Sequence, residues 1–318
     1  MLAFLLRRLL YAAGTVVLTA FFAYGTMRVL RPEQYPGQAT WPDLFSDVDR
    51  ALLHFDFGCA TMFAGCPPVK RLWLDGVWAD LLLLAGGLAF GVAFGVLGGL
   101  WCASRPRTRS ARSLEWLASV LYCAPVYVIG LGLLLLFAPP FGLLDFPWFF
   151  DPDSYAPPLV NPWDFVRSML LPWVVVGAPL GAAILRLTQT LAIEALGEDY
   201  IRTAEAKGVP HPRVVRRHAG PPTYVSVASL VSASAPLTIM NLVLVEYVFA
   251  LPGFFRHARR ALGQVPNWPP PKVPPLDIPT LQALALWAAV LIVLLGLLSD
   301  LAIMRLDPRI RASGGTVG

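Results

Sequence analysis

Residues 81–103 read LLLLAGGLAFGVAFGVLGGLWCA, which is a run of 23 positions without a charged side chain. A bilayer has a hydrocarbon core about 30 Å thick, and roughly 20 apolar residues in a helix are enough to cross it. A helix in the core of a water-soluble domain keeps a polar face, and this run has none. The stretch therefore predicts a transmembrane helix.

Five further runs of similar length follow the same pattern. The chain has 318 residues, of which 56% are hydrophobic and only 14% charged, whereas about a quarter of the residues of a soluble domain are charged. We therefore expect an all-α integral membrane protein with six transmembrane helices. The expected spans are Leu9–Leu30, Leu81–Ala103, Leu114–Ala138, Leu170–Leu191, Val225–Ala250 and Leu281–Met304.

The basic residues indicate which side of the membrane each loop occupies. Six spans place both termini on one side, together with the loops 104–113 and 186–224, and these segments hold 15 of the 25 Lys and Arg residues. The opposite side holds 13 of the 20 acidic residues. Cytoplasmic loops of membrane proteins are rich in Lys and Arg, so both termini are expected in the cytoplasm. The basic composition thus reflects topology, and no nucleic-acid partner is expected.

The predicted organisation divides the chain near residue 80. Residues 1–80 comprise the first helix and a long extracytoplasmic loop, and residues 81–318 comprise a five-helix core. Cys59 and Cys66 lie in the long loop, on the oxidising side of the membrane, where a disulfide is chemically feasible. Two ordinary buried thiols remain the alternative.

The sequence gives no support for chemistry performed by the chain itself. No Gly-Lys dipeptide occurs, so a phosphate-binding P-loop is excluded. The four His residues show no zinc-ligand spacing. We expect no catalytic residues, cofactor or metal on this chain, and any ATP would be bound by a partner.

Small residues recur along one face of the second span. Gly87, Gly91, Gly95 and Gly99 are spaced by four, which lets another helix backbone approach closely. Helix packing is the simpler interpretation, and a sliding contact in a gating bundle is the alternative. Four prolines in or beside later spans are expected to mark bends: Pro125, Pro172, Pro179 and Pro236.

The fifth span holds two polar candidates for a translocation path, Asn241 and Glu246. Ionisable groups inside the membrane are costly unless they face protein or water. Glu246 either lines the outer vestibule, where it would meet the amino group of a peptide, or makes a structural hydrogen bond to a neighbouring span.

The segment 194–222 is the most informative loop. Asp199 is a suitable N-cap, Tyr200–Lys207 is a short predicted helix, and Gly208 followed by Pro210 is a stop signal. So short a helix is unstable alone and needs a groove to bind in. The residues assigned to it are Asp199, Tyr200, Ile201, Arg202, Thr203, Ala204, Glu205, Ala206, Lys207 and Gly208.

This loop resembles the coupling segment of permease subunits of ATP-binding cassette importers. The pattern of that segment is Glu-Ala-Ala, then a Gly, and then a final Pro. In this chain Arg202-Thr203-Ala204, Gly208 and Pro221 occupy these positions. Gly220 and Pro222 depart from the Leu and Asn that the pattern has on either side of the final Pro. The residues of this loop are similar to those of the dipeptide and oligopeptide permease branch of the family. Further matches to that branch are Arg7-Arg8, Glu246 with Phe249 and Leu251-Pro252-Gly253, and Asp307-Pro308-Arg309. The long loop after the first span is typical of the first permease type.

The resemblance implies a type I importer permease in a bacterial inner membrane. The chain would pair with a second homologous permease, two ATPase domains that bind ATP and Mg²⁺, and an extracytoplasmic solute-binding protein. Residues 200–208 would dock in a cleft of one ATPase and couple its closure to the spans, with peptides as the expected cargo. The alternatives are an ATP-independent secondary transporter or channel of six helices, and, for the loop, an inert amphipathic connector.

Overall fold

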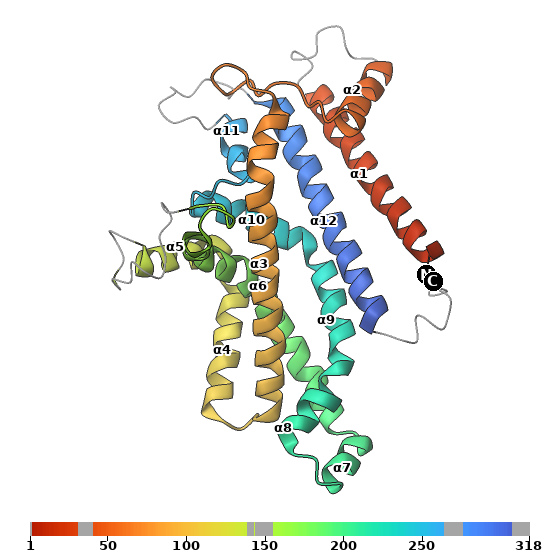
Figure 1. The fold of residues 1–318 in the computed structure, drawn as a ribbon, viewed down its shortest axis with the longest axis vertical. Helices are drawn as coiled ribbons and strands as arrows, with labels where there is room; N and C mark the ends of the chain where they lie inside the picture. Colours follow the sequence, from red (N-terminus) through yellow and green to blue (C-terminus); the bar gives the residue numbers. More distant parts are fainter. Residues whose placement is uncertain (1, 31–40, 139–142, 144–154, 264–275, 307–318) are drawn as a thin grey trace. The chain divides into compact units, whose positions relative to one another are not determined.

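The computed structural model describes residues 2–30, 41–138, 143, 155–263 and 276–306. Within these ranges the regular elements are helices, and one isolated β-bridge pairs Cys59 with Pro68. Figure 1 shows the helices, which are, in chain order, α1 (Leu2–Leu30), α2 (Trp41–Leu53), α3 (Val69–Ser104), α4 (Arg109–Cys123), α5 (Val126–Phe137), α6 (Pro162–Leu196), α7 (Asp199–Ala206), α8 (His211–Val214), η3 (Val215–Ala219), α9 (Pro221–Ala233), α10 (Ala235–Val248), η4 (Phe255–His257), α11 (Ala258–Ala261) and α12 (Ile278–Leu306).

Among the described residues, four helices are long and apolar enough to cross a membrane unaided: α1, α3, α6 and α12. The other two predicted spans, Leu114–Ala138 and Val225–Ala250, are each built from two helices. α4 and α5 meet at a bend of 115°, and α9 and α10 at one of 59°. These two predicted spans are therefore not single helices. The number of candidate membrane crossings in the described residues is four, or six if each bent pair is counted as one span.

The two breaks lie at prolines, as the sequence predicts. Ala124, which precedes Pro125, has an extended backbone with ψ 134°, because a proline ring disfavours the helical conformation of the residue before it. Pro236 occupies the first turn of α10, where the missing N–H has no helical partner to lose. Pro172 and Pro179, in contrast, lie inside α6, which continues through both.

The long helices extend beyond their apolar runs. α3 begins at Val69 instead of Leu81, and α6 runs from Pro162 to Leu196 instead of from Leu170 to Leu191. The side chain of Asn161 caps α6, since its Oδ1 accepts hydrogen bonds from the backbone N–H groups of Trp163 and Asp164. Hydropathy detects the part of a helix that lipid covers, so polar extensions of this kind are missed.

The chain divides into two compact units. Unit 1 comprises Met1–Asp80 and Pro252–Leu297, and unit 2 comprises Leu81–Leu251 and Leu298–Gly318. The division predicted from the sequence has the same first boundary, after residue 80, but keeps 81–318 together. The structure instead groups Pro252–Leu297 with the N-terminal segment, a long-range association that composition does not encode.

Unit 1 contains a helix that the sequence analysis did not predict, α2, which packs against α1 (Figure 1). Tyr24 of α1 lies in one buried cluster with Leu44 and Val48 of α2. An ion pair of 2.6 Å between Arg28 Nη2 and Asp47 Oδ2 adds a charged contact between the same two helices. Part of the loop expected between the first two spans is therefore folded onto the first helix.

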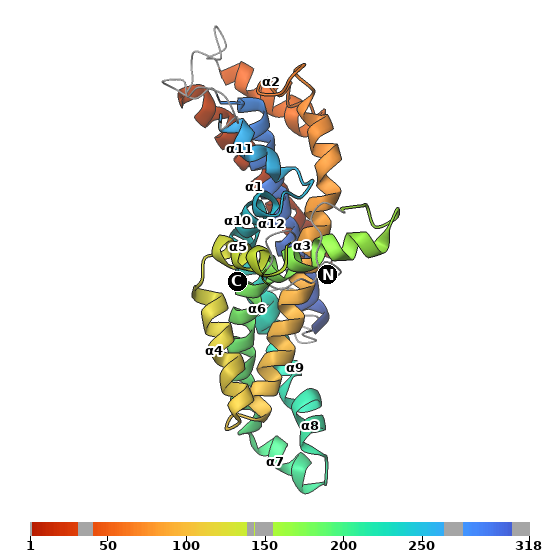
Figure 2. The ribbon, with the colours of Figure 1, turned by 90° about the vertical axis from the view of Figure 1, so that its left-hand side faces the viewer.

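Unit 2 is organised around α6. The helices α4, α5, α9 and α10 all pack against it, and Figure 2 shows α4 running beside α6. Arg186 of α6 donates a 2.6 Å hydrogen bond to Ser119 Oγ of α4, and Gln189 donates one of 2.6 Å to Glu115 Oε1. The short helices α7 and α8 follow directly from the end of α6, so α6 joins the bundle to the candidate site.

Candidate functional site

The predicted coupling helix is present as α7, with its start moved by one residue. α7 spans Asp199–Ala206, and its N-cap is Glu198, whose backbone is extended at φ −74° and ψ 150°. The prediction of Asp199 as N-cap is therefore wrong. Asp199 is the first helical residue, where its negative charge favours the N-terminal end of the helix dipole, and it lies 3.5 Å from Arg202 in an exposed ion pair. Lys207, expected inside the helix, is the C-cap.

One residue of α7 anchors the helix to the rest of the chain. The side chain of Ile201 is 1% exposed, whereas Tyr200 retains 47% of its surface. Ala204 is half-buried, and the other residues of the predicted set are exposed: Asp199, Arg202, Thr203, Glu205, Ala206, Lys207 and Gly208. The helix is thus held by one apolar contact and leaves most of its surface open.

Gly208 ends the helix in the left-handed region, with φ +81°. This is the conformation that the helix-stop pattern predicts for a glycine. A Cβ added at Gly208 would meet no atom within 4 Å. The requirement for glycine at this position therefore comes from the backbone and not from local crowding.

A short polar contact connects α7 to the next helix. Glu205 Oε1 lies 3.0 Å from His211 Nδ1, which is the first residue of α8. Both side chains are about half exposed, so the pair contributes little to stability but narrows the orientation of α7 relative to α8.

The segment after α8 is a π-helix, η3, which the sequence analysis missed. Val215 of η3 packs with Leu100, Ala103 and Ala192, the ends of α3 and α6. The hydroxyl of Tyr200 donates a 3.4 Å hydrogen bond to the carbonyl of His218. In an α-helix that carbonyl would accept from residue 222, but Pro222 has no N–H to give.

The Pro221-Pro222 pair was the sequence feature from which this irregular turn could have been inferred. Two adjacent prolines leave two carbonyls of the preceding turn without their helical donors. π-turns inside helices are rare and frequently mark functional positions. The departure of Gly220 from the family pattern also has a local reason, because a Cβ there would lie 2.9 Å from Tyr224 Oη and 3.1 Å from the carbonyl oxygen of Arg216.

The glycine stripe of α3 packs directly on α6. A Cβ at Gly91 would lie 2.7 Å from the carbonyl oxygen of Gly177, and one at Gly95 would lie 2.5 Å from Ile184 Cβ. Gly87 and Gly99 meet α6 in the same way, against Val176 and against Leu185 and Thr188. The four glycines therefore bring two helix backbones into contact, which is the simpler of the two interpretations.

The two candidates for a translocation path occupy different environments on α10. Asn241 is half-buried, whereas Glu246 is only 1% exposed and is among the largest fully buried side chains of the described residues. The backbone carbonyl of Glu246 accepts from the N–H of Leu251 at 3.0 Å. In this conformation the carboxylate faces protein, which favours a structural role over a direct contact with cargo.

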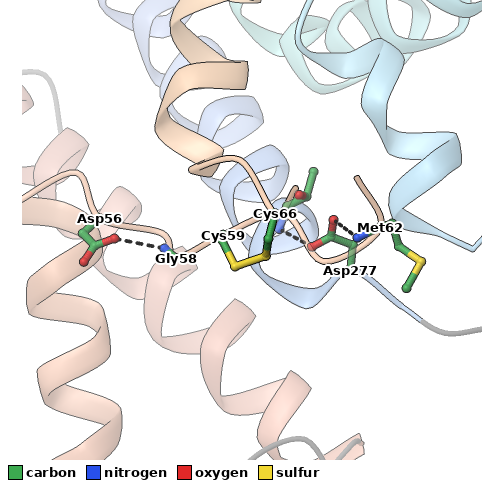
Figure 3. Close-up of a disulfide and its surroundings, with 7 residues drawn as sticks. Asp56, Gly58, Cys59, Met62, Cys66 and Asp277 are labelled. Carbon is green, nitrogen blue, oxygen red and sulfur yellow. Dashed lines mark hydrogen bonds between the residues drawn. A yellow bond between two sulfur atoms is a disulfide. The ribbon is translucent and has the colours of Figure 1, made fainter. Parts of the chain in front are cut away.

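Cys59 and Cys66 form a disulfide that closes a loop in unit 1 (Figure 3). Met62, inside the loop, donates its backbone N–H to Asp277 Oδ2 at 3.2 Å. Phe63 lies edge-on to the ring of His257, with centroids 5.2 Å apart, and the guanidinium of Arg260 lies 4.7 Å from the Phe63 ring centre. The closed loop is thus held against η4, α11 and Asp277, which directly precedes α12.

One motif of the sequence analysis, the C-terminal Asp307-Pro308-Arg309, falls outside the described residues. Within the part of the chain that the structure describes, no three His, Cys, Asp or Glu side chains lie close enough to hold a metal ion.

Comparison with known proteins identifies the family to which the chain belongs. Residues 95–312 match the family described as "Binding-protein-dependent transport system inner membrane component". The chain is 31% identical over 243 residues to the dipeptide transport system permease protein DppB of Haemophilus influenzae, covering 72% of this chain and 67% of that protein.

Two further relatives agree with this. The chain is 31% identical over 263 residues to a probable peptide ABC transporter permease protein, y4tP, of Sinorhizobium fredii, covering 82% of this chain and 77% of the relative. It is 28% identical over 269 residues to the oligopeptide transport system permease protein OppB of Mycobacterium tuberculosis, with 81% and 77% covered. The matched range contains α7, η3 and two of the four stripe glycines, Gly95 and Gly99, and the chain therefore belongs to the family of binding-protein-dependent transport system inner membrane components.

Proposed function

We propose that this chain is the permease subunit of an ATP-driven peptide importer and that α7 couples it to an ATPase. The observation that carries the proposal is the form of α7 within a family-matched loop. It is a helix of eight residues that ends at Gly208 and buries Ile201 while most of its surface stays exposed. An isolated helix of this length is unstable, so a partner groove accounts for its exposed surface.

The proposed orientation places α7 in the cytoplasm with both termini. The support is the distribution of charge, since 15 of the 25 Lys and Arg residues lie in the terminal segments and the loops 104–113 and 186–224. The disulfide supports the same orientation, because Cys59 and Cys66 then lie in an oxidising compartment. Of the described cysteines outside that bond, Cys102 and Cys123 both lie in helices.

The proposed mechanism uses α7 as the element on which the motor acts. ATP and Mg²⁺ would be bound by two ATPase domains, and closure of these domains on nucleotide would move α7. Val215 packs against the ends of α3 and α6, and the 2.7 Å hydrogen bond from Thr223 Oγ1 to the carbonyl of Gly220 stiffens the turn between η3 and α9. Movement of α7 would therefore reorient α9 and α6 together instead of bending the loop alone.

A second permease would complete the path. α10 exposes an apolar stripe at Leu237, Met240 and Tyr247, which are 68%, 62% and 52% exposed. Its opposite face is buried in unit 2 at Ile239, Leu242 and Val245. A homologous permease packed on this stripe would enclose a path between the two chains, and an extracytoplasmic solute-binding protein would deliver the cargo.

Peptides are the proposed cargo, because all three relatives described above are named as peptide, dipeptide or oligopeptide permeases. The experiment is reconstitution of the purified complex in liposomes with its solute-binding protein and labelled di- and oligopeptides. We expect ATPase subunits to co-purify and uptake to require ATP. Uptake that is independent of ATP, with no ATPase in the purified complex, would contradict the proposal and support a secondary transporter or channel.

A further inference from the structure

Asp80 is a buried carboxylate in α3 that the proposed mechanism does not use. Its side chain is 0% exposed, and a buried ionisable group is costly unless it is hydrogen-bonded. In the sequence it lies at the edge of the apolar run that begins at Leu81, where a charged residue indicates only the end of a span. Its retention inside the protein therefore requires specific partners.

Two donors from distant parts of unit 1 meet this carboxylate. The backbone N–H of Phe254 donates to Oδ1 at 2.8 Å, and the indole Nε1–H of Trp287 donates to Oδ2 at 2.6 Å. Hydrogen bonds to an ionised group are about twice as strong as neutral ones. Asp80 thus joins α3, the segment Pro252–Phe254 and α12 through one side chain.

A second observation shows that the same contact is built into the backbone. One helical turn before Asp80, a Cβ at Gly76 would lie 2.3 Å from the backbone nitrogen of Phe254 and 2.7 Å from the carbonyl carbon of Gly253. No side chain fits between these backbones. Phe254 itself is 0% exposed, so the segment is fixed on both its polar and its apolar sides.

The position of this contact along the chain is informative. The chain passes between the two units after Asp80, after Leu251 and after Leu297. Asp80 is the last residue of unit 1 on α3, and Phe254 lies two residues beyond the point where the chain re-enters unit 1. Within unit 1, the carboxylate therefore ties together two of the three passages.

We propose that Asp80 is a positioning residue for transport: it holds two chain passages together on the unit 1 side, so that unit 1 moves as one body when the permease changes conformation. The inference rests on the proposed transport function and adds to it a residue remote from α7. Loosening this tie would let the two passages shift independently. ATP would then be hydrolysed without full transfer of the motion to the path.

The test compares Asp80→Asn with a matched control, Asp277→Asn, in the complete reconstituted complex. Asp277 is also 0% exposed and also accepts two hydrogen bonds in unit 1, in its case from the backbone N–H groups of Met62 at 3.2 Å and Thr280 at 3.3 Å. Unlike Asp80 and Phe254, it is not at or next to a passage in the sequence. Both substitutions replace a buried, hydrogen-bonded carboxylate by an amide. A difference between the variants in peptide uptake per ATP hydrolysed therefore reports the position of the residue and not its burial alone.

The measured quantity is peptide taken up per ATP hydrolysed, alongside the melting temperature of each complex. For Asp80→Asn we expect a fall of about tenfold in this ratio, the factor that corresponds to losing one hydrogen bond to a charged group. For Asp277→Asn we expect a similar loss of melting temperature and an unchanged ratio. Equal ratios in the two variants would overturn the inference, whereas absence of ATP-dependent uptake in the unmodified complex would instead overturn the proposed function.

Trp287→Phe provides a second route if Asp80→Asn fails to assemble. An Asn amide turns one N–H₂ toward a partner that is itself a donor, and removing the indole N–H relieves that opposition. The double variant should therefore take up no less peptide per ATP hydrolysed than Asp80→Asn alone. If Asp80→Asn does not assemble, the double variant is compared with Trp287→Phe alone, and the same result is expected. Independent, multiplicative losses from the two changes would show that the residues do not act through one contact and would refute the proposal.

Discussion

At the scale of single residues, Gly208 is the clearest test of the coupling helix. We expect Gly208→Val to abolish uptake while the chain still inserts into the membrane. A residue with a Cβ pays about 1–2 kcal/mol in the left-handed region, and a β-branched one is the least compatible with it. The measurement is ATP-dependent peptide uptake, with the amount of chain in the membrane fraction determined in parallel.

Gly208→Asn is the matched control, because asparagine tolerates the left-handed region better than other side chains and the site has free space around it. It should retain much of the uptake that Gly208→Val loses. Full transport by the valine variant would show that the end of α7 does not need this backbone conformation for coupling.

His257 gives the chain a predicted dependence on pH. The pKa of His257 is lowered from 6.5 to about 4, first because of burial and then because of the nearby charges of Arg256 and Arg260, which outweigh the opposing effect of Asp75. Between these two pH values His257 is protonated in the unfolded chain but stays neutral in the folded chain. The free energy of unfolding is therefore unaffected by this group above about pH 6.5 and falls progressively as the pH decreases toward about 4.

The measurement is the melting temperature of the purified protein in detergent between these two pH values. His257→Gln removes the titration and should flatten the decline, while the loss of the ring contact with Phe63 lowers the melting temperature of the variant by the same amount at each pH. A decline of the same steepness in both proteins would assign the pH dependence to other groups.

The residues that sequence reasoning found and missed differ in a physical way. The left-handed conformation of Gly208 was predictable because it depends on local backbone geometry, whereas the Cys59–Cys66 disulfide was one of two alternatives that the sequence left open. Asp80 was not predictable, since its partners Phe254 and Trp287 lie 174 and 207 residues away. In the sequence alone, a carboxylate beside an apolar run indicates only the end of a span, because the hydrogen-bond donors that reach it come from distant segments.

At the scale of elements, the contact between α3 and α6 leads to a sharp prediction. Gly91→Ala should destabilise the protein by roughly 1–3 kcal/mol, because the added methyl group would overlap a packed backbone. Gly132→Ala in α5 is the control, since a Cβ there meets nothing within 4 Å, and alanine in an open helical position is favoured over glycine by about 0.5–1 kcal/mol. Thermal unfolding of both variants tests this, and equal effects would contradict close packing at Gly91.

The irregular elements show what an apolar run leaves undetermined. The runs around Leu114–Ala138 and Val225–Ala250 predicted membrane segments, but hydropathy does not say whether a run is one helix or two. Pro125 ended α4 as expected, whereas Pro172 and Pro179 left α6 continuous. A proline inside a span is tolerated where neighbouring groups satisfy the freed carbonyl, and that depends on packing, which a single sequence does not contain.

At the scale of the whole molecule, the proposed sidedness can be checked directly. In a background that lacks Cys102 and Cys123, we expect Arg50→Cys in α2 to react with a membrane-impermeant thiol reagent in intact spheroplasts. Ala206→Cys in α7 should react only after the membrane is opened. Both native positions are exposed, so a difference in labelling reports the side of the membrane. Labelling of Ala206→Cys from outside would overturn the coupling proposal.

The architecture was partly accessible from the sequence for a simple reason. The bilayer imposes one strong constraint, a length of apolar helix, and four helices satisfy it in the described residues. The grouping of Pro252–Leu297 with Met1–Asp80 follows from contacts between distant segments, and neither hydropathy nor charge indicates it. α2 was missed because a helix that lies on another helix needs only a narrow apolar face.

The disulfide of Figure 3 needs only a short segment of chain to form, whereas its contact with Asp277 needs almost the whole protein. Its cysteines are seven residues apart, but the Asp277 carboxylate that receives the Met62 N–H lies 215 residues further along the chain. On the proposed sidedness, the ring can close as soon as its segment is exported, since no distant residue is required to bring the two thiols together. Docking of the ring against Asp277 must wait until the ribosome has synthesised that part of the chain.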